Sequence, residues 1–105
     1  MTKVEFSSGI CGFNSTLTFD KKSDECVVMN IESSCPHITG LNSGEPIEID
    51  PMAEIFGMGE SKLPNCHQSL QHRACPFLTA SLKGVEVEAD LALPKDVAIS
   101  IKKES

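Results

Sequence analysis

The residues best suited to chemistry in this sequence are its cysteines. Five occur in 105 residues, at positions Cys11, Cys26, Cys35, Cys66 and Cys75. An odd number leaves one cysteine over in any set of disulfide pairs. In a reducing compartment such cysteines are more often metal ligands or redox thiols than structural bridges. We therefore interpret them first as a metal-binding set.

Two of these cysteines are followed directly by proline, in Cys35-Pro36 and Cys75-Pro76. Proline suits the first helical position because its φ is fixed and it has no amide hydrogen to leave unpaired. The pattern therefore predicts that each cysteine is the N-cap of a helix. The free amides and the positive dipole end of a helix N-terminus favour a thiolate, which is the metal-binding form.

Two further cysteines lie in loop-like sequence. Cys11 is flanked by Gly9 and Gly12, which permit positive φ and let the backbone wrap closely around a bound group. Cys66 follows Pro64-Asn65 and is also expected in a loop. Whole structural elements separate the candidates, so only the fold can bring them together. The predicted ligands are Cys11, Cys35, Cys75 and Cys66.

The spacing of these ligands favours an iron–sulfur cluster over zinc. Zinc ribbons and fingers usually carry Cys-x-x-Cys pairs, and this chain has none. An iron–sulfur cluster with its thiolates is negatively charged, which suits helix N-termini and glycine turns, and Cys-Pro occurs in the ferredoxin ligand run. A structural zinc site in a partner-binding module, a thiol redox protein, and cysteines buried as small apolar residues stay open as alternatives. The sequence contains no recognised catalytic motif.

The remaining cysteine and the histidines are weaker candidates. Cys26 is predicted to be structural, because it starts an alternating strand pattern in phase with Val28. His37, His67 and His72 each lie near a candidate cysteine, and an imidazole could replace or supplement a thiolate at a metal. Exposed loop histidines are nevertheless more frequent than ligands, and His72 is the strongest of the three.

The strands that must position these residues follow from alternation of apolar and polar side chains. This pattern predicts strands at residues 4–6, 17–19 and 27–31, with a charged turn over residues 20–25 joining the second and third as an antiparallel pair. The same pattern at residues 97–101 predicts a closing strand that joins the other three.

Capping signals and helical spacing predict the helices. Asp50 followed by Pro51 predicts a short helix over residues 51–56, ended by Gly57. Apolar residues three to four apart predict the longest helix from Pro76 to the stop at residues 93–94, in which Gly84 marks a close backbone approach. Residues 68–74 could form a short helix or a loop. The predicted fold is α+β, a small, mostly antiparallel sheet of about four strands with two to three helices.

Composition indicates a single acidic, soluble domain over residues 1–105. The net charge of −6 and the scattered basic residues argue against nucleic-acid binding. No apolar run approaches the ~20 residues needed to cross a membrane. The opening six residues alternate polar and apolar types, unlike a secretory signal, so we expect a cytoplasmic location.

Several segments resemble a family of small uncharacterised proteins from anaerobic archaea and bacteria. The resemblance spans nearly the whole chain and is carried by four segments: Ser8-Gly9-Ile10-Cys11-Gly12-Phe13, Cys35-Pro36, Ala74-Cys75-Pro76 and Leu91-Ala92-Leu93-Pro94-Lys95-Asp96-Val97. It implies that Cys11, Cys35 and Cys75 are the shared cysteines, whereas residues 64–71 match the family pattern poorly. It also implies an anaerobic cytoplasm, but no assigned activity.

The function predicted from these observations is electron transfer or cluster carriage by a small iron–sulfur protein. Such a protein needs a redox or cluster-accepting protein partner. If only three cysteines bind the cluster, one iron is open to a non-cysteine ligand, to a substrate or to a second copy of the chain, which would make a homo-oligomer.

Overall fold

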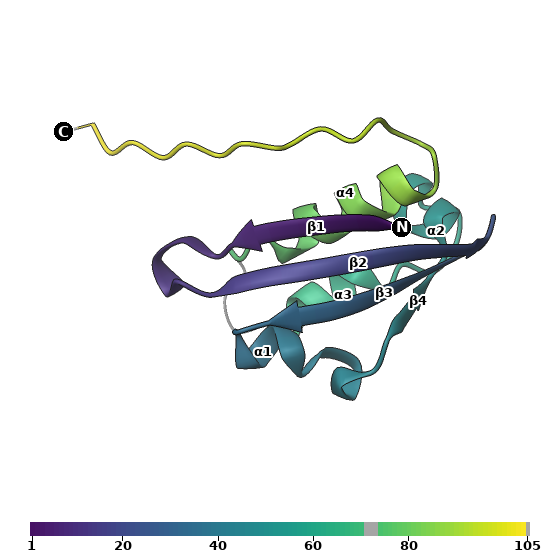
Figure 1. Cartoon of the computed structure of the whole chain (residues 1–105), viewed down its shortest axis with the longest axis horizontal. Helices are drawn as coiled ribbons and strands as arrows, with labels where there is room; N and C mark the ends of the chain where they lie inside the picture. The colour runs from purple at the N-terminus through teal and green to yellow at the C-terminus, as the bar shows by residue number, and fades with distance from the viewer. Residues whose placement is uncertain (71–73, 105) are drawn as a thin grey trace.

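A computed structural model describes residues 1–70 and 74–104. Its sheet consists of four antiparallel strands in the order β1-β2-β3-β4 (Figure 1). Their bounds are β1 Thr2–Ser7, β2 Asn14–Ser23, β3 Cys26–Ser33 and β4 Ile47–Ile49. The four helices of the described residues are α1 Pro36–Thr39, α2 Pro51–Phe56, α3 Leu63–Gln68 and α4 Phe77–Glu88. Two short 3-10 turns are η1 Gly9–Cys11 and η2 Leu41–Gly44. The predicted α+β class is confirmed, with one helix more than expected.

The sheet buries one face because apolar residues alternate along its strands. Leu17 and Phe19 of β2 and Val27 and Met29 of β3 are completely buried. The antiparallel register places Phe19 opposite Met29, so these side chains meet on the same face. The first three predicted strands are therefore confirmed.

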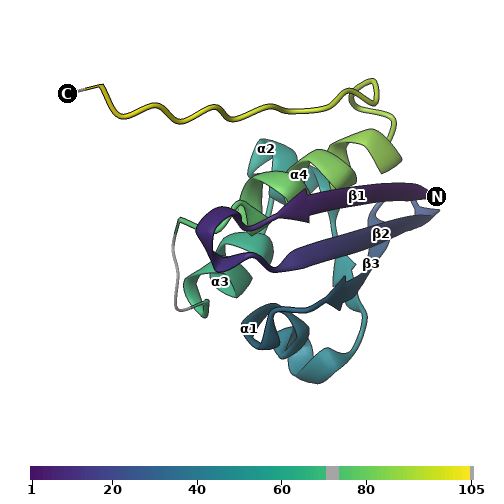
Figure 2. The same ribbon diagram turned by 60° about the vertical axis from the view of Figure 1, so that its left-hand side comes forward.

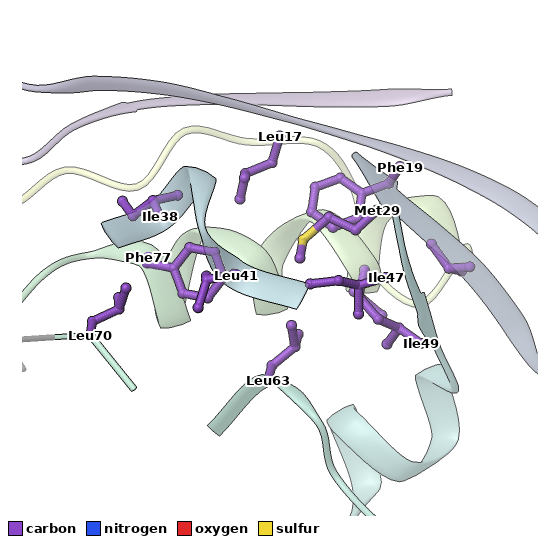
Figure 3. Packing of buried hydrophobic residues seen from close by; sticks show 12 residues of the cluster. Leu17, Phe19, Met29, Ile38, Leu41, Ile47, Ile49, Leu63, Leu70 and Phe77 are labelled. Atoms are coloured by element: carbon purple, nitrogen blue, oxygen red, sulfur yellow. The ribbon is translucent and has the colours of Figure 1, made fainter. Parts of the chain in front are cut away.

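The helices cover this buried face and one margin of the sheet. α4 packs against β1 and β2, α2 and α3 pack against α4, and α1 packs against β3 (Figure 2). Side chains of the strands and helices meet in one apolar cluster (Figure 3). Its larger members include Leu17, Phe19, Met29, Ile38, Ile49, Leu63 and Phe77.

The close approach predicted at Gly84 is present. A Cβ atom at Gly84 would overlap the ring of Phe19, so α4 can lie directly on β2 only because this position has no side chain. Burial of the Phe19 ring against the helix backbone offsets the low helix propensity of glycine.

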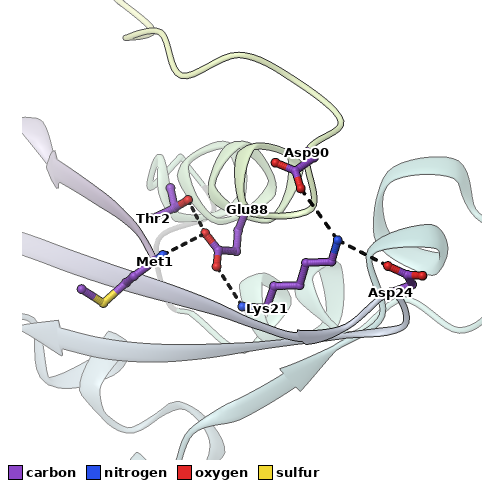
Figure 4. A network of polar contacts seen from close by, with 6 residues as sticks. All are labelled: Met1, Thr2, Lys21, Asp24, Glu88 and Asp90. Carbon is purple, nitrogen blue, oxygen red and sulfur yellow. Dashed lines mark hydrogen bonds and ion pairs between the residues drawn. The ribbon is translucent and has the colours of Figure 1, made fainter.

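The far end of α4 is tied to the sheet by Glu88 (Figure 4). The Thr2 hydroxyl donates to Glu88 Oε1 at 2.6 Å, and the Lys21 amide donates to Oε2 at 2.8 Å. The N-terminal ammonium of Met1 lies 3.6 Å from the same carboxylate. One carboxylate thus joins the beginning of β1, the far end of β2 and the last turn of α4.

The short helix α2 has the predicted caps. The amide of Met52 donates to Asp50 Oδ1 at 3.0 Å, and Pro51 occupies the first turn. Gly57 ends the helix with φ 69°.

The predicted C-terminal strand is wrong. The chain beyond α4 is extended, but residues 97–101 pair with none of the described strands. The fourth strand is instead β4, Ile47–Ile49, which is too short to show a clear alternating pattern. The long helix also ends earlier than predicted, at Glu88.

Residues 63–68 also differ from expectation. They form the helix α3, so Cys66 is helical and not in a loop. Of the predicted segment 68–74, residues 71–73 lie outside the described residues. In the described part of the chain, no helix has the length and apolar character required to cross a membrane.

Candidate functional site

The topology brings three of the predicted ligands to one end of the sheet. Cys11 lies in the connection from β1 to β2, and Cys35 follows the end of β3. Because β2 and β3 are antiparallel, the start of β2 lies beside the end of β3. α4 runs back along β1, with its last turn held at Thr2, so its first turn and Cys75 lie near the end of β1.

The loop that carries Cys11 is closed by its own backbone. The amide of Ser8 donates to the Phe13 carbonyl at 2.9 Å, and the amide of Gly12 donates to the Gly9 carbonyl at 2.9 Å. Gly9 and Gly12 have φ values of 74° and 72°, as the sequence predicted. Cys11 ends the 3-10 turn and is partly buried.

Cys35 is positioned by a pair of serine hydroxyls. Ser33 Oγ lies 2.7 Å from Ser15 Oγ and accepts a hydrogen bond from the Cys35 amide at 3.0 Å. Next to them, the Asn14 amide donates to Ser34 Oγ at 3.1 Å. These contacts join the start of β2, which follows the Cys11 loop, to the segment that carries Cys35.

The predicted N-cap role is confirmed for Cys35 and wrong for Cys75. Cys35 is the N-cap of α1 and Pro36 is its first residue. At α4 the N-cap is Pro76 and the helix begins at Phe77, so Cys75 is one residue outside the helix. Pro76 has a ψ of 8°, which is not helical, so Phe77 is the first residue of α4.

A single cavity of about 400 Å³ is bordered by all three of these cysteines. Cys75 Sγ also lies 4.0 Å from the Ser8 hydroxyl, so the β1–β2 loop and the start of α4 are in contact. The cavity is lined by Ser8, Ile10, Cys11, Phe13, Cys35, Pro36, His37, Ile38, Leu70, Ala74 and Cys75. The structure therefore brings Cys11, Cys35 and Cys75 together although they are far apart in sequence.

The wall of this cavity is apolar apart from its sulfur atoms and two polar side chains. Among the described lining residues, His37 is the only ionisable group besides the thiols. Ile38 and Leu70 are buried lining residues, whereas Ile10 is fully exposed on the loop that carries Cys11. We refer to this cavity below as the three-cysteine pocket.

Cys66 is not among the residues that line the three-cysteine pocket. It is partly buried on α3, packed against the apolar cluster. Burial raises the pKa of the Cys66 thiol and the nearby carboxylate of Glu54 raises it further, with Lys62 acting in the opposite direction. These surroundings favour the neutral thiol over the thiolate.

The other candidates divide by position. Cys26 begins β3 and Cys35 follows the end of that strand, so they lie at opposite ends of it, as expected for a cysteine outside the site. His67 is on α3 and does not line the pocket, whereas His37 does. His72 lies outside the described residues.

The spacing of possible metal ligands is the last feature of the site. Among residues 1–70 and 74–104, no three or more side chains of His, Cys, Asp or Glu are close enough to hold one metal ion. Cys11, Cys35 and Cys75 border one cavity without forming such a compact group in the described part of the chain. Sequence reasoning did not single out Ser33, whose role depends on its cross-strand neighbour.

Comparison with known proteins gives a family but no activity. No curated protein matches the chain, and no solved structure matches it. One family model, described as a family of unknown function, matches residues 2–101. The match covers nearly the whole chain, including every cysteine discussed above. The chain belongs to this family, DUF6951.

Proposed function

We propose that the three-cysteine pocket holds an iron–sulfur cluster and that the protein transfers electrons or carries the cluster to a partner. Cys11, Cys35 and Cys75 are its proposed thiolate ligands. The observation that supports this function is the convergence of three cysteines, from three separate segments, on one cavity of about 400 Å³. When bound, the cluster would supply one-electron redox chemistry.

A cluster fits this geometry better than a single zinc ion. Zinc requires sulfur ligands at ~2.3 Å from one point in tetrahedral arrangement. The cysteines of the pocket border a cavity, and the described residues contain no such compact set. A cluster accepts each thiolate on a different iron and so tolerates a wider separation of the sulfur atoms.

Three cysteines leave a position of the cluster to be filled. His37 is the nearest alternative in the chain, because it lines the same pocket and follows Cys35 by two residues. Cys66 was predicted for this role, but its place on α3 outside the pocket requires a movement of that helix. An outside group, including a residue of another protein chain, is the third source.

The apolar wall would determine how the cluster behaves. Ile38 and Leu70 are buried against the pocket and would exclude water from the sulfur atoms. Limited solvent access and few hydrogen bonds to sulfur disfavour the more negative oxidation state and lower the reduction potential. A low potential suits an anaerobic, reducing cytoplasm, which is where we place the protein.

The exposed rim of the pocket offers a contact for the partner. Ile10 is fully exposed next to Cys11, although large apolar side chains are usually at least partly covered. A redox or cluster-accepting protein that covers Ile10 would come close to the cluster, as electron and cluster transfer both require.

The experiment is anaerobic purification followed by measurement of iron, acid-labile sulfide, zinc and the absorption spectrum. We expect iron and sulfide in equal amounts and a broad absorption near ~400 nm that is bleached by reduction. A Cys75→Ser variant is the control and should lose both elements. A colourless protein with stoichiometric zinc would contradict the cluster and favour the zinc module. A protein without metal whose thiols form a reversible disulfide would favour the thiol redox alternative.

A further inference from the structure

We propose that residues 95–101 of one copy pair as a strand with the free edge of β1 in a second copy, so that two chains exchange their C-terminal segments. We call residues 92–104 the tail. The inference is independent of the cluster, because it concerns the outer edge of the sheet and none of the cysteines borders the groove that it uses.

The first half of this interface is an edge strand. β1 pairs with β2 on one side only, and it is the first strand in the sheet order. Its outer backbone amides and carbonyls therefore have no strand partner in the described part of the chain. Val4 and Phe6 of β1 pack against the apolar cluster but are only partly buried. Folded proteins normally cover or pair such an edge.

The second half is the tail, whose sequence is that of a strand. Val97, Ile99 and Ile101 alternate with Ala98 and Ser100. The three apolar side chains are 54%, 71% and 90% exposed. Both views show the tail extended and outside the sheet (Figures 1 and 2). An extended, alternating, exposed segment is suited to pairing with a sheet edge.

A groove lies between β1, α4 and the tail. A cavity of about 610 Å³ is bordered by β1, by α4 and by the tail. Val4 and Phe6 contribute to it from β1, and Ala80 and Val87 contribute from α4. A strand placed in this groove would hydrogen-bond to β1 and would direct every second side chain towards Ala80 and Val87 of α4.

A second copy is the occupant that these features favour. The chain's own tail borders the groove from the far side without entering it, although Val97 and Ile99 reach its wall. Each copy thus has one unpaired sheet edge, at β1, and one unpaired extended segment, the tail. In a two-fold symmetric dimer the tail of each copy would pair with β1 of the other.

Charge does not distinguish a second copy from the chain's own tail. Residues 95–104 hold three lysines against two acids, in a chain of net charge −6. The body side of the groove is bordered by Lys3, Lys83 and Glu5, so the tail and the groove do not carry opposite net charges.

The test uses the full chain and its Ile99→Asp and Ser100→Asp variants. The two changes add the same charge at neighbouring tail positions, but only Ile99 would face α4. Both residues are exposed in the single chain, so neither change should disturb its fold. Light scattering gives the mass, and hydrogen exchange gives the protection of amides in β1 and the tail across protein concentrations.

We expect a dimer of twice the 11.3 kDa chain, with amides of residues 95–101 and of β1 protected together. Ile99→Asp should raise the dimer dissociation constant by about ten-fold or more, because it buries a charge, and Ser100→Asp should change it by less than about three-fold. A monomer with a protected tail would show that the tail closes on its own β1 and would overturn the proposal. A monomer with an unprotected tail, or a dimer that Ile99→Asp leaves intact, would also overturn it.

Discussion

The hydroxyl of Ser15 lies 2.7 Å from the hydroxyl of Ser33, across the antiparallel pair of β2 and β3. Ser15 is buried, and Ser33 also accepts the amide hydrogen of Cys35. The contact therefore connects the beginning of β2, just after the Cys11 loop, with the residue that begins α1. The two hydroxyl groups thus fix the position of Cys35 relative to the Cys11 loop.

Replacing Ser33 by Ala should loosen the pocket. The change leaves the Ser15 hydroxyl and the Cys35 amide without their partner, which costs about 1–2 kcal/mol of unfolding free energy. It should also lower iron retention during dialysis against a chelator. Thr16→Ala is the control, because Thr16 follows Ser15 but points to the opposite face of the sheet. Equal iron loss in both variants would contradict the positioning role of Ser33.

Single cysteine-to-serine variants should divide into two groups. Cys11→Ser, Cys35→Ser and Cys75→Ser should each lose most of the bound iron and sulfide, because each removes a thiolate from the pocket. Cys26→Ser should retain them, since Cys26 lies at the other end of β3. The measurement is the amount of iron and of acid-labile sulfide bound per folded chain in each variant.

The fourth ligand is tested within the same series. Cys66→Ser should keep the cluster, because Cys66 does not line the pocket, whereas His37→Ala should alter its spectrum or its stability. Electron paramagnetic resonance of the reduced protein reports on the ligands at each iron. Loss of the cluster in Cys66→Ser would show that α3 moves when the cluster binds.

Replacing Gly84 by Ala should destabilise the protein, although alanine is the better helix former. The new Cβ overlaps the Phe19 ring, and such overpacking costs about 1–3 kcal/mol against a gain of about 1 kcal/mol in helix propensity. Urea unfolding measures the difference. A double variant with Phe19→Leu should recover part of the loss contributed by Gly84→Ala, and strict additivity of the two changes would contradict a direct contact.

Glu88 should make stability depend on pH. Partial burial opposes ionisation, but the hydrogen bonds from Thr2 and the Lys21 amide, with the N-terminal ammonium, lower the pKa of Glu88 overall. A lowered folded-state pKa stabilises the protein above the unfolded value of about 4.3. That contribution is lost as the pH falls below this value and through the folded-state pKa.

The Glu88→Gln variant isolates this contribution. It should be less stable than the wild type by about 1 kcal/mol at pH 7, and the difference should shrink as the pH falls below about 4. Urea unfolding at a series of pH values makes the comparison. Glu45→Gln, at an exposed carboxylate, should follow the wild-type curve throughout. A constant difference between Glu88→Gln and wild type at every pH would contradict the lowered pKa.

Local patterns in the sequence determined most of the secondary structure. Alternation at β2 and β3 and the Asp50-Pro51 start of α2 depend on neighbouring residues, so they are readable without the fold. The positive φ values at Gly9 and Gly12 follow in the same way from residue type. The sequence also identified Cys11, Cys35 and Cys75 as candidates from their glycine and proline neighbours.

Tertiary structure decided where those candidates lie. Strand register and the direction of α4 place Cys11, Cys35 and Cys75 around one cavity, and leave Cys66 on α3 outside it. Pairing also decided which apolar segment became the fourth strand: β4 lies beside β3, whereas the tail has the better pattern but no strand partner in the described chain. Alternation shows that a segment can form a strand, but a strand exists only where another edge satisfies its hydrogen bonds, and that edge is supplied by residues distant in sequence.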